Sequence, residues 1–431
     1  MDSSINLKNL KGTSDFLPRE QIQRNKIISI LRTNFEKYGY LPVETPILNY
    51  LSLLAYKYDD DAEIIKEIYK LSDQANRKLG LRYDLTIPFC KLISLNKDLS
   101  IPFRRYEIGK VFRNGPVKLG RTREFYQCDV DVVGIDGRYI EVEQLLMVIN
   151  IFKDLSINIV IKWNNRKLMV GLLQDIGIEN ELIDKVIGLI DRLDKITANE
   201  LKQEFNNINI NEDKVKQLLE IFNMSLDEYY DNYMNTTNVL IKEAINECLE
   251  INNYIKAFGI EDKVIFNPKL ARGLGIYTGI VFEFFDKDMR IASSLGGGGR
   301  YNKIITEFLD DGKEYPSIGL SFGLEPIYTI LNMNNENISS IDVLLVPMGT
   351  FEYCLKLAEE LRNNNINVLT QLNKRKLGKS FEYADRENIK FVVVVGSDEV
   401  EKQIYSIKNM QTKEQFNLSI KDAITLIKNN K

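Results

Sequence analysis

The stretch from Arg104 to Gly134, RRYEIGKVFRNGPVKLGRTREFYQCDVDVVG, constrains the fold of this chain more than any other. It predicts two long strands joined by a loop, because Asn114-Gly115-Pro116 is a turn signal and proline does not extend a central strand. Side chains alternate between the two faces of a strand. One face of this hairpin therefore carries Arg113 from the first strand. The same face carries, from the second strand, Phe125, Gln127, Asp129 and Asp131.

The loop of the hairpin is strongly basic. Between Arg104 and Arg123 there are seven basic residues and one acid, although the whole chain has a formal net charge of −4. Acceptors for an ammonium group on one strand, beside cations in the loop, indicate an anionic ligand that also has a positively charged end. The pattern leaves a second interpretation open, in which the charges only solvate an exposed hairpin.

Length and composition are typical of a globular protein with several domains. The 431 residues predict two or three domains, with 44% apolar and 27% charged residues. No apolar run is long enough to span a membrane and the N-terminus lacks a signal peptide, which predicts a cytoplasmic protein without membrane contact. The four cysteines are scattered without a CxxC pair, so we expect neither disulfides nor a metal held by the protein.

The complete absence of histidine narrows the chemistry. It excludes the usual general base, the commonest metal ligand and every nucleophile that a histidine activates. Catalysis in such a chain has to rely on positioning and electrostatic stabilisation, or on carboxylates and lysines.

Hydrophobic periodicity predicts the elements before the central hairpin and a helical region after it. A second hairpin precedes the central one, and alternation along its last strand puts Asp84 and Thr86 on one face. A later region, polar and poor in glycine, predicts a helical insertion outside the main sheet. The expected elements are a helix over about 19–38, a strand over 40–48, hairpin strands over 63–71 and 78–87, a helix over about 88–95 and the insertion over about 166–254.

Glycines and a polar linker organise the rest of the chain. The run from Gly296 to Gly299 predicts a close approach of the backbone to a ligand, with a flexible turn as the alternative. After a polar linker over 332–340, strands alternate with helices, which predicts an α/β domain with a parallel core. We therefore expect one domain over residues 1–335 and a second over residues 341–431.

Together these motifs resemble one family, the histidyl-tRNA synthetases, which are class II aminoacyl-tRNA synthetases. KGTSDFLP, LRYDLT and LARGLGIYTG resemble signatures of that family. YGYLPVETPIL, the Arg104–Gly134 stretch and SIGLSFGLE resemble class II motifs 1, 2 and 3. LGGGGRY resembles the glycine-rich strand, and KRKLGKSFEYADRENIKFVVVVG resembles the anticodon-binding domain. The likeness covers nearly the whole chain.

The resemblance implies both a fold and a reaction. The implied fold is an α+β catalytic domain with an antiparallel sheet and a helical insertion, followed by a C-terminal α/β anticodon-binding domain. The implied activity is that of a histidine–tRNA ligase, which attaches histidine to its tRNA through a histidyl-adenylate and uses ATP with Mg²⁺. Motif 1 further implies a homodimer, with the interface around Pro46.

The resemblance also implies which residues form the site. Three would hold the α-ammonium group of histidine, namely Asp84, Thr86 and Gln127. Three more would surround the imidazole ring, namely Asp131, Tyr277 and Tyr301. The catalytic cations would be Arg113, on the α-phosphate of ATP, and Arg272, at the reacting carboxylate and phosphate. Cations of this kind stabilise charge that develops in the transition state.

The chain departs from the family pattern at four positions. Gly115 stands where the family often has an acid that contacts adenine, and Pro326 stands where motif 3 has an arginine for the γ-phosphate. Gly275 and Ile276 replace an acid and a tyrosine in the Arg-Gly-Leu signature. We therefore expect other cations to help to bind ATP. The candidates are Arg121, Arg123 and Arg300.

These departures leave two other functions open. Regulators of histidine biosynthesis share the catalytic fold without charging tRNA, although they typically lack an anticodon-binding domain. A sensor that binds tRNA or histidine without catalysis would keep the whole architecture. The retained histidine-contact positions, Arg113 and Arg272 favour the ligase.

Overall fold

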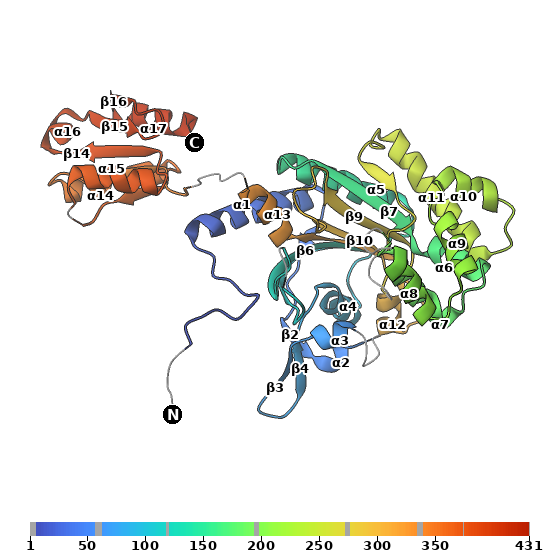
Figure 1. The fold of residues 1–431 in the computed structure, drawn as a ribbon. Helices are drawn as coiled ribbons and strands as arrows, with labels where there is room; N and C mark the ends of the chain where they lie inside the picture. The colour runs from blue at the N-terminus through green and yellow to red at the C-terminus, as the bar shows by residue number, and fades with distance from the viewer. Residues whose placement is uncertain are drawn as a thin grey trace. The chain divides into compact units, whose positions relative to one another are not determined.

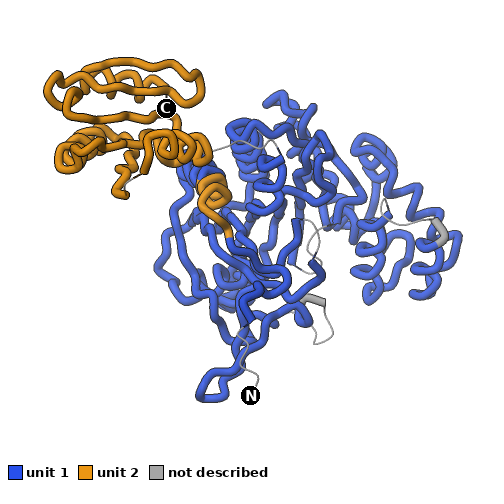
Figure 2. The backbone as a smooth tube through the Cα atoms, turned by 60° about the vertical axis from the view of Figure 1, so that its left-hand side comes forward, with its two compact units in different colours: residues 1–15, 26–333 blue, residues 16–25, 334–431 orange. Residues whose placement is uncertain are grey.

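The computed structural model of this protein describes residues 6–56, 63–117, 120–193, 198–271, 276–333, 339–373 and 375–430. The chain divides into two compact units (Figure 2). Unit 1 comprises residues 1–15 and 26–333, and unit 2 comprises residues 16–25 and 334–431. Each unit has its own sheet and its own hydrophobic core.

Unit 1 is built on an eight-stranded sheet with the order β1-β5-β6-β11-β10-β9-β7-β8. The two outermost pairs, β1 with β5 and β7 with β8, are parallel, and all other neighbours are antiparallel. The predicted fold class, with its largely antiparallel sheet, is confirmed. The strands are β1 (Leu41–Pro42), β5 (Phe103–Phe112), β6 (Glu124–Val133), β11 (Ser317–Gly323), β10 (Gly296–Arg300), β9 (Ile280–Asp286), β7 (Ile159–Asn165) and β8 (Val264–Phe266).

One face of this sheet is covered by α1 (Pro18–Lys37), α5 (Tyr139–Asp154) and α13 (Leu324–Asn332), as Figure 1 shows. In α1 the buried residues Ile27, Leu31 and Phe35 are spaced four apart, so they lie on one side of the helix. They pack into the same core as the inner side chains of α5 and α13. These helices cover one face of the central strands, so a site can form only on the opposite face.

Shorter elements pack on the opposite face. They are the strands β2 (Leu48–Tyr50), β3 (Lys70–Ser72) and β4 (Lys78–Leu81), with the helices α2 (Leu51–Leu54), α3 (Glu63–Glu67), α4 (Thr86–Leu95) and α12 (Asn302–Leu309). The strand predicted over 40–48 is in fact two short strands, β1 and β2, because prolines interrupt it. The second hairpin exists but is shorter than predicted, since 63–67 is the helix α3.

The prediction that Asp84 and Thr86 share a strand face is wrong. Strand β4 ends at Leu81, and Thr86 is the first residue of α4. The Asp84 carboxylate accepts the amide N–H of Ile87 at 3.2 Å, which satisfies a free donor in the first turn. Pro88 suits that turn, since proline is tolerated there. The two residues are therefore brought together by a helix start.

The four glycines form the buried strand β10 between β9 and β11, so the alternative of a flexible turn is excluded. A Cβ atom at Gly298 would lie 1.9 Å from the carbonyl oxygen of Gly319, and one at Gly299 would lie 2.4 Å from that of Ile280. Real Cβ atoms are never that close to a backbone oxygen. The glycines let the backbones of β9 and β11 lie close to that of β10. Tyr301 directly follows β10 and lies on the face of the sheet that α1, α5 and α13 leave uncovered.

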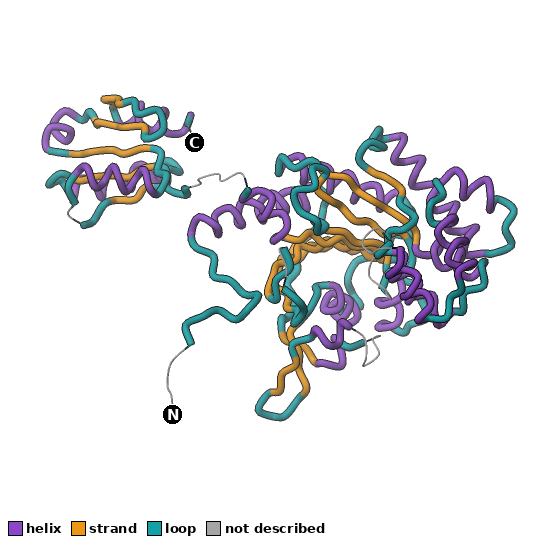
Figure 3. The backbone as a smooth tube through the Cα atoms, in the orientation of Figure 1, coloured by secondary structure: helices purple, strands orange, loops and turns teal. Residues whose placement is uncertain are grey.

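A group of helices lies together beside the sheet where the insertion is predicted (Figure 3). Its hydrophobic core is separate from that of the sheet. The helices are α6 (Arg166–Asp175), α7 (Asn180–Ile190), α8 (Ala198–Asn207), α9 (Glu212–Ile221), α10 (Leu226–Tyr233) and α11 (Val239–Ala257). Among the helices of the described ranges, none is both long and apolar enough to cross a membrane.

Unit 2 has a five-stranded sheet with the order β13-β12-β14-β15-β16. Its first three strands are parallel, as predicted, and the last two are antiparallel. Parallel neighbours need crossover helices, which α14 and α15 supply. The elements are β12 (Val343–Pro347), α14 (Phe351–Asn363), β13 (Val368–Thr370), α15 (Leu377–Arg386), β14 (Phe391–Val395), α16 (Ser397–Lys402), β15 (Tyr405–Asn409), β16 (Gln415–Leu418) and α17 (Ile420–Asn429).

Candidate active site

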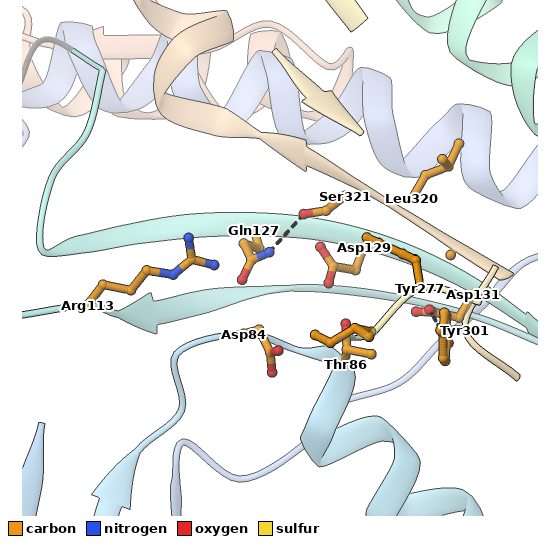
Figure 4. Close-up of a pocket in the computed structure, with 12 residues that line it drawn as sticks. Asp84, Thr86, Arg113, Gln127, Asp129, Asp131, Tyr277, Tyr301, Leu320 and Ser321 are labelled. Atoms are coloured by element: carbon orange, nitrogen blue, oxygen red, sulfur yellow. Dashed lines mark hydrogen bonds between the residues drawn. The ribbon is translucent and has the colours of Figure 1, made fainter. Parts of the chain in front are cut away.

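A pocket of about 260 Å³ opens on the face of the sheet that carries the short elements (Figure 4). Strands β6 and β11 form its floor, and the start of α4 and residues 276–277 form its walls. It is lined by Asp84, Thr86, Arg113, Gln127, Asp129, Asp131, Ile276, Tyr277, Tyr301, Gly319, Leu320 and Ser321.

Gln127, Asp129 and Asp131, which were predicted to share one face of the second strand of the hairpin, all line the pocket. Arg105 of β5 lies opposite Asp131 of β6, and Gly109 lies opposite Gln127. On its other edge β6 pairs with β11, where Gly319 is opposite Asp131. A Cβ atom at position 319 would lie 2.0 Å from Asp131 Oδ1, so only glycine leaves room for this carboxylate.

The structure brings most of the predicted site residues together and separates a few. Those that line the pocket are Asp84, Thr86, Arg113, Gln127, Asp131, Tyr277 and Tyr301. Arg121 and Arg123 lie beyond it in the β5–β6 loop, and Arg272 lies outside the described residues. Ile276, at one of the departures from the family pattern, is part of the wall.

Arg300 does not serve as a substitute cation for ATP. It is 2% exposed, and its Nε donates to the carboxylate of Glu141 at 2.7 Å. Its Nη1 donates to the carbonyl oxygen of Ile135 at 3.0 Å. These contacts fix Arg300 beneath the site, so the expectation that it binds ATP is wrong.

The pocket is elongated, with unlike chemistry at its two ends. Arg113 stands at one end, and Asp131 and Tyr301 stand at the other (Figure 4). The Nε of Arg113 donates to the carbonyl oxygen of Tyr83 at 3.0 Å, and its guanidinium lies 5.1 Å from the centre of the Phe125 ring. These contacts hold the guanidinium of Arg113 at this end of the pocket, where it presents a fixed positive charge.

Buried charges determine the electrostatics at the inner end of the pocket, the end with Asp131 and Tyr301. The fully buried Arg105 forms an ion pair with Asp131 at 2.6 Å, and Tyr301 donates its hydroxyl hydrogen to the same carboxylate. Burial raises the pKa of Asp131, while Arg105 and the bond from Tyr301 lower it. An acceptor held in this way can receive a hydrogen bond from a ligand N–H without rearranging.

Asp129 is a site residue that the sequence-based assignment missed. Alternation already puts it between Gln127 and Asp131, but it received no role. Within the described residues, Asp129 Oδ1 and Gln127 Oε1 are buried and have no hydrogen-bond partner. Gln127 Nε2 donates to Ser321 Oγ at 2.9 Å, which turns its oxygen away from that serine. Such unpaired acceptors in a pocket suit the N–H donors of a ligand.

Burial also raises the pKa of two acids in the pocket. The pKa of Asp84 rises to about 6, although Arg113 and Arg105 oppose the shift. The pKa of Asp129 rises to about 7, chiefly because of burial, and the neighbouring Asp131 and Asp84 charges raise it further. Arg105 and a hydrogen bond with Ser321 lower this pKa but offset the rise only in part. A bound ammonium group would favour the ionised forms of both carboxyls.

We predict that Asp129 gives the stability of unit 1 a pH dependence. The folded protein keeps a proton on this carboxyl up to about pH 7, whereas the unfolded chain loses it near its ordinary pKa of 3.8. The stabilisation that this protonated carboxyl gives the folded state is complete below pH 3.8 and is lost as the pH rises through about 7. Asp129→Asn should therefore flatten the fall in unfolding free energy between about pH 5 and about pH 8.

This prediction can be measured by urea unfolding at each pH. The fluorescence of Trp163, the single tryptophan of the chain and buried in β7, follows unit 1 alone. Asp136→Asn, at an acid that is 76% exposed, serves as the control and should keep the wild-type slope. Equal slopes for wild type and Asp129→Asn would contradict the prediction.

Two family models match the chain. One described as histidyl-tRNA synthetase covers residues 12–327, and one described as anticodon binding domain covers residues 342–430. A histidine–tRNA ligase 1 of Bacillus cereus is 42% identical over 96% of this chain and 98% of that protein. A histidine–tRNA ligase of Clostridium tetani is 34% identical over 97% of this chain and 98% of that protein.

A solved structure agrees with these sequence matches. The histidyl-tRNA synthetase of Nostoc sp. PCC 7120 superimposes with a TM-score of 0.88, at 29% identity over 99% of this chain and 100% of that one. The match extends through the pocket and both units. With a family model over most of its length and ligase relatives that align from end to end, this chain belongs to the histidyl-tRNA synthetase family.

Proposed function

We propose that this chain is a histidine–tRNA ligase, with the pocket on its sheet as the site of both steps. In the first step the carboxylate of histidine attacks the α-phosphate of ATP, which forms histidyl-adenylate and releases pyrophosphate. In the second step a hydroxyl at the 3′ end of the tRNA attacks the histidyl carbonyl, and AMP leaves. The observation that carries this proposal is the elongated pocket, with acceptors for N–H groups at one end and Arg113 at the other.

Histidine occupies the inner part of the pocket in this proposal. Its α-ammonium group is held by Asp84, Thr86 and Gln127, and Asp129 adds a second carboxylate nearby. Its imidazole ring lies toward Asp131 and the two tyrosines, where the Asp131 carboxylate accepts from a ring N–H. An apolar amino acid would leave these buried polar groups unpaired, which makes discrimination strong.

ATP extends from Arg113 along the β5–β6 loop. Arg113 holds the α-phosphate and stabilises the charge that develops during attack, with no need for a protein base because the nucleophile is already ionised. Arg121 and Arg123 take the outer phosphates in place of the arginine that Pro326 replaces. We assign Arg272 to the reacting carboxylate and phosphate on the resemblance alone.

Mg²⁺ enters with ATP in this proposal. Among the described residues there is no group of three or more acids, cysteines or histidines placed to hold a metal. That fits an ion that keeps several waters and is coordinated largely by phosphate oxygens. Its contribution is to neutralise the phosphate charge, next to that of the arginines.

The test is amino-acid-dependent exchange between ATP and pyrophosphate, run with each of the twenty amino acids. Exchange with histidine alone supports the first step and the tolerance of Gly115 and Pro326. Transfer of labelled histidine to tRNA then tests the second step. A protein that binds histidine but exchanges with no amino acid would instead be a non-charging regulator or sensor.

A second copy of the chain packs on the edge strand β1 in this proposal. Strand β1 is outermost in the sheet, and edge strands offer unpaired backbone groups. Around Pro46, large apolar side chains are exposed: Leu41 by 63%, Leu48 by 49% and Tyr50 by 56%. Analytical ultracentrifugation should give the mass of two chains, and Leu48→Lys should shift it toward one.

Unit 2 contacts the anticodon end of the tRNA in this proposal. Arg375, Lys376 and Lys379 are exposed near the start of α15, where phosphates can reach them. The guanidinium of Arg375 lies 4.9 Å from the centre of the Tyr383 ring, a pairing that suits stacking on an unpaired base. A reducing compartment such as the cytoplasm suits the four cysteines, which are all buried and form no disulfide.

A further inference from the structure

The face of the hairpin that carries the pocket continues past Arg113 into the loop. The amide N–H of Arg113 donates to the carbonyl oxygen of Arg123 at 2.9 Å, which continues the pairing of β5 with β6. Two residues further on, Gly115 and Arg121 come side by side, since a Cβ atom at Gly115 would lie 3.4 Å from Arg121 Nη2. This pair therefore lies where the outer part of an ATP molecule would extend from Arg113.

A carboxylate from another element fills the space over Gly115. Glu67, the last residue of α3, has its Oε1 at 2.9 Å from Arg121 Nη2. Its carbonyl oxygen accepts the amide N–H of Asn114 at 2.8 Å, so backbone and side chain both contact the loop. A Cβ atom at Gly115 would lie only 2.3 Å from Glu67 Oε1. With glycine at position 115 the carboxylate fits as it stands, whereas a Cβ atom there would force it to shift.

Burial makes Glu67 the fixed partner of the pair. Its side chain is 10% exposed, and its neighbours Ile65 and Ile68 are buried in the core beneath α4. The Arg121 side chain is 50% exposed, so part of its guanidinium remains open to solvent or to a ligand. A long side chain held at one side by a fixed carboxylate has less rotamer freedom to lose when it meets a phosphate.

We infer that Glu67 is a positioning residue for ATP, which holds the guanidinium of Arg121 toward the outer phosphates. This inference rests on the proposed function. It assigns Glu67 a role that no motif of the sequence gives it, and it gives a steric reason for glycine at position 115. The residue acts through Arg121, so it is expected to affect ATP and leave histidine alone.

The test compares four variants in the exchange reaction and by calorimetry with ATP. Glu67→Ala should raise the KM and Kd for ATP about tenfold and leave the KM for histidine unchanged, since hydrogen bonds to charged groups have effects of this size. Gly115→Ala, which keeps both charges, should have the same effect because its Cβ displaces the carboxylate. Glu67→Ala combined with Arg121→Ala should bind ATP no more weakly than Arg121→Ala alone.

A matched control is available in the neighbouring hairpin. Asp73 pairs with Arg77 at 2.5 Å, and Asp73→Ala should leave both KM values unchanged. The inference is overturned if Glu67→Ala has no effect on ATP, if it raises both KM values together with a lower Tm, or if its effect adds fully to that of Arg121→Ala. A wild-type protein that binds ATP without any exchange would refute the proposed function, and the Kd values would still decide the role of Glu67.

Composition carries a second, independent inference. None of the 431 residues is histidine. We infer that synthesis of this chain does not depend on the product of its own proposed reaction, because ribosomes that translate it never wait for histidyl-tRNA. When charged tRNA is scarce, the chain could still be made while histidine-containing proteins stall. This inference also rests on the proposed function.

The test is a pulse-labelling experiment in a histidine-requiring host. The comparison uses a variant with histidine at exposed positions of the helical insertion, such as Gln203, Asn207 and Gln217. During histidine limitation, incorporation of the labelled amino acid into the wild-type chain should continue, whereas incorporation into the variant should fall sharply. The purified variant should keep wild-type exchange activity, which separates translation from catalysis. Equal falls in labelling of the two chains would overturn the inference, whatever the exchange assay gives.

Discussion

Replacement of Arg113 with glutamine is expected to slow histidine-dependent ATP–pyrophosphate exchange by about 10²- to 10³-fold. Arg113 is the one cation among the described residues that line the pocket, and a preorganised donor contributes most where charge develops. Glutamine keeps a polar side chain but loses the charge. The loss should appear in kcat, because the interaction strengthens as the α-phosphate is attacked.

The histidine affinity of this variant should stay within about twofold of wild type, because Arg113 stands at the opposite end from Asp131. Calorimetry with histidine checks this. Arg375→Gln is the matched control, since it removes an exposed arginine from unit 2 and should leave exchange unchanged. An Arg113→Gln enzyme with near wild-type kcat would refute the role proposed for this residue.

Replacement of Arg105 with methionine is expected to lower the free energy of unfolding of unit 1 by about 3–5 kcal/mol. Arg105 is fully buried, 2.6 Å from Asp131 and 3.7 Å from Glu107, and it lies over the Phe89 ring at 4.3 Å. Methionine fills similar space but leaves the buried Asp131 carboxylate without its cation, whereas Glu107 keeps Arg82 at 2.7 Å. Breaking a buried pair on one side is costly because the remaining charge stays desolvated.

The neighbouring Arg104 provides the control for this effect. It lies on the other face of β5, is 25% exposed and pairs with Glu143, which is 38% exposed. Arg104→Met should therefore change the unfolding free energy by less than about 1 kcal/mol. Urea unfolding followed by Trp163 fluorescence measures both variants in unit 1. A small effect of Arg105→Met would mean that the carboxylates near it take up protons at little cost.

Local patterns in the sequence were enough to predict the central hairpin. Its alternation placed Arg113, Gln127 and Asp131 on one face, and the register of β5 with β6 agrees. The helix predicted over about 19–38 matches α1, Pro18–Lys37, to within one residue at each end. Both elements are long and strongly periodic, which is where sequence patterns are most reliable. The short segment before α4 was misassigned because two or three alternating residues do not distinguish a strand from a helix start.

The role of each charged residue was harder to predict, because it depends on partners that are remote in sequence. Arg300 and Arg121 have the same charge and both follow glycine-rich segments. Arg300 is buried and donates a hydrogen bond to Glu141, which is 159 residues away in the sequence. Arg121 pairs with Glu67, which is 54 residues away, and its side chain remains half exposed. The sequence places Asp129 on the correct face. Its importance depends on the surroundings that the tertiary structure gives it, with β11 paired beside β6 and Oδ1 buried without a hydrogen-bond partner among the described residues.

The sequence by itself determined the family, the faces of the central hairpin and, through the absence of histidine, a chemistry based on cations and carboxylates. These are local properties, fixed by residue type and spacing. Only the tertiary structure decided that Arg300 is buried while Arg121 stays half exposed, that Glu67 lies against Gly115, and that Asp129 belongs to the pocket. Desolvation and pairing depend on which distant segments pack together, and no stretch of the chain carries that information alone.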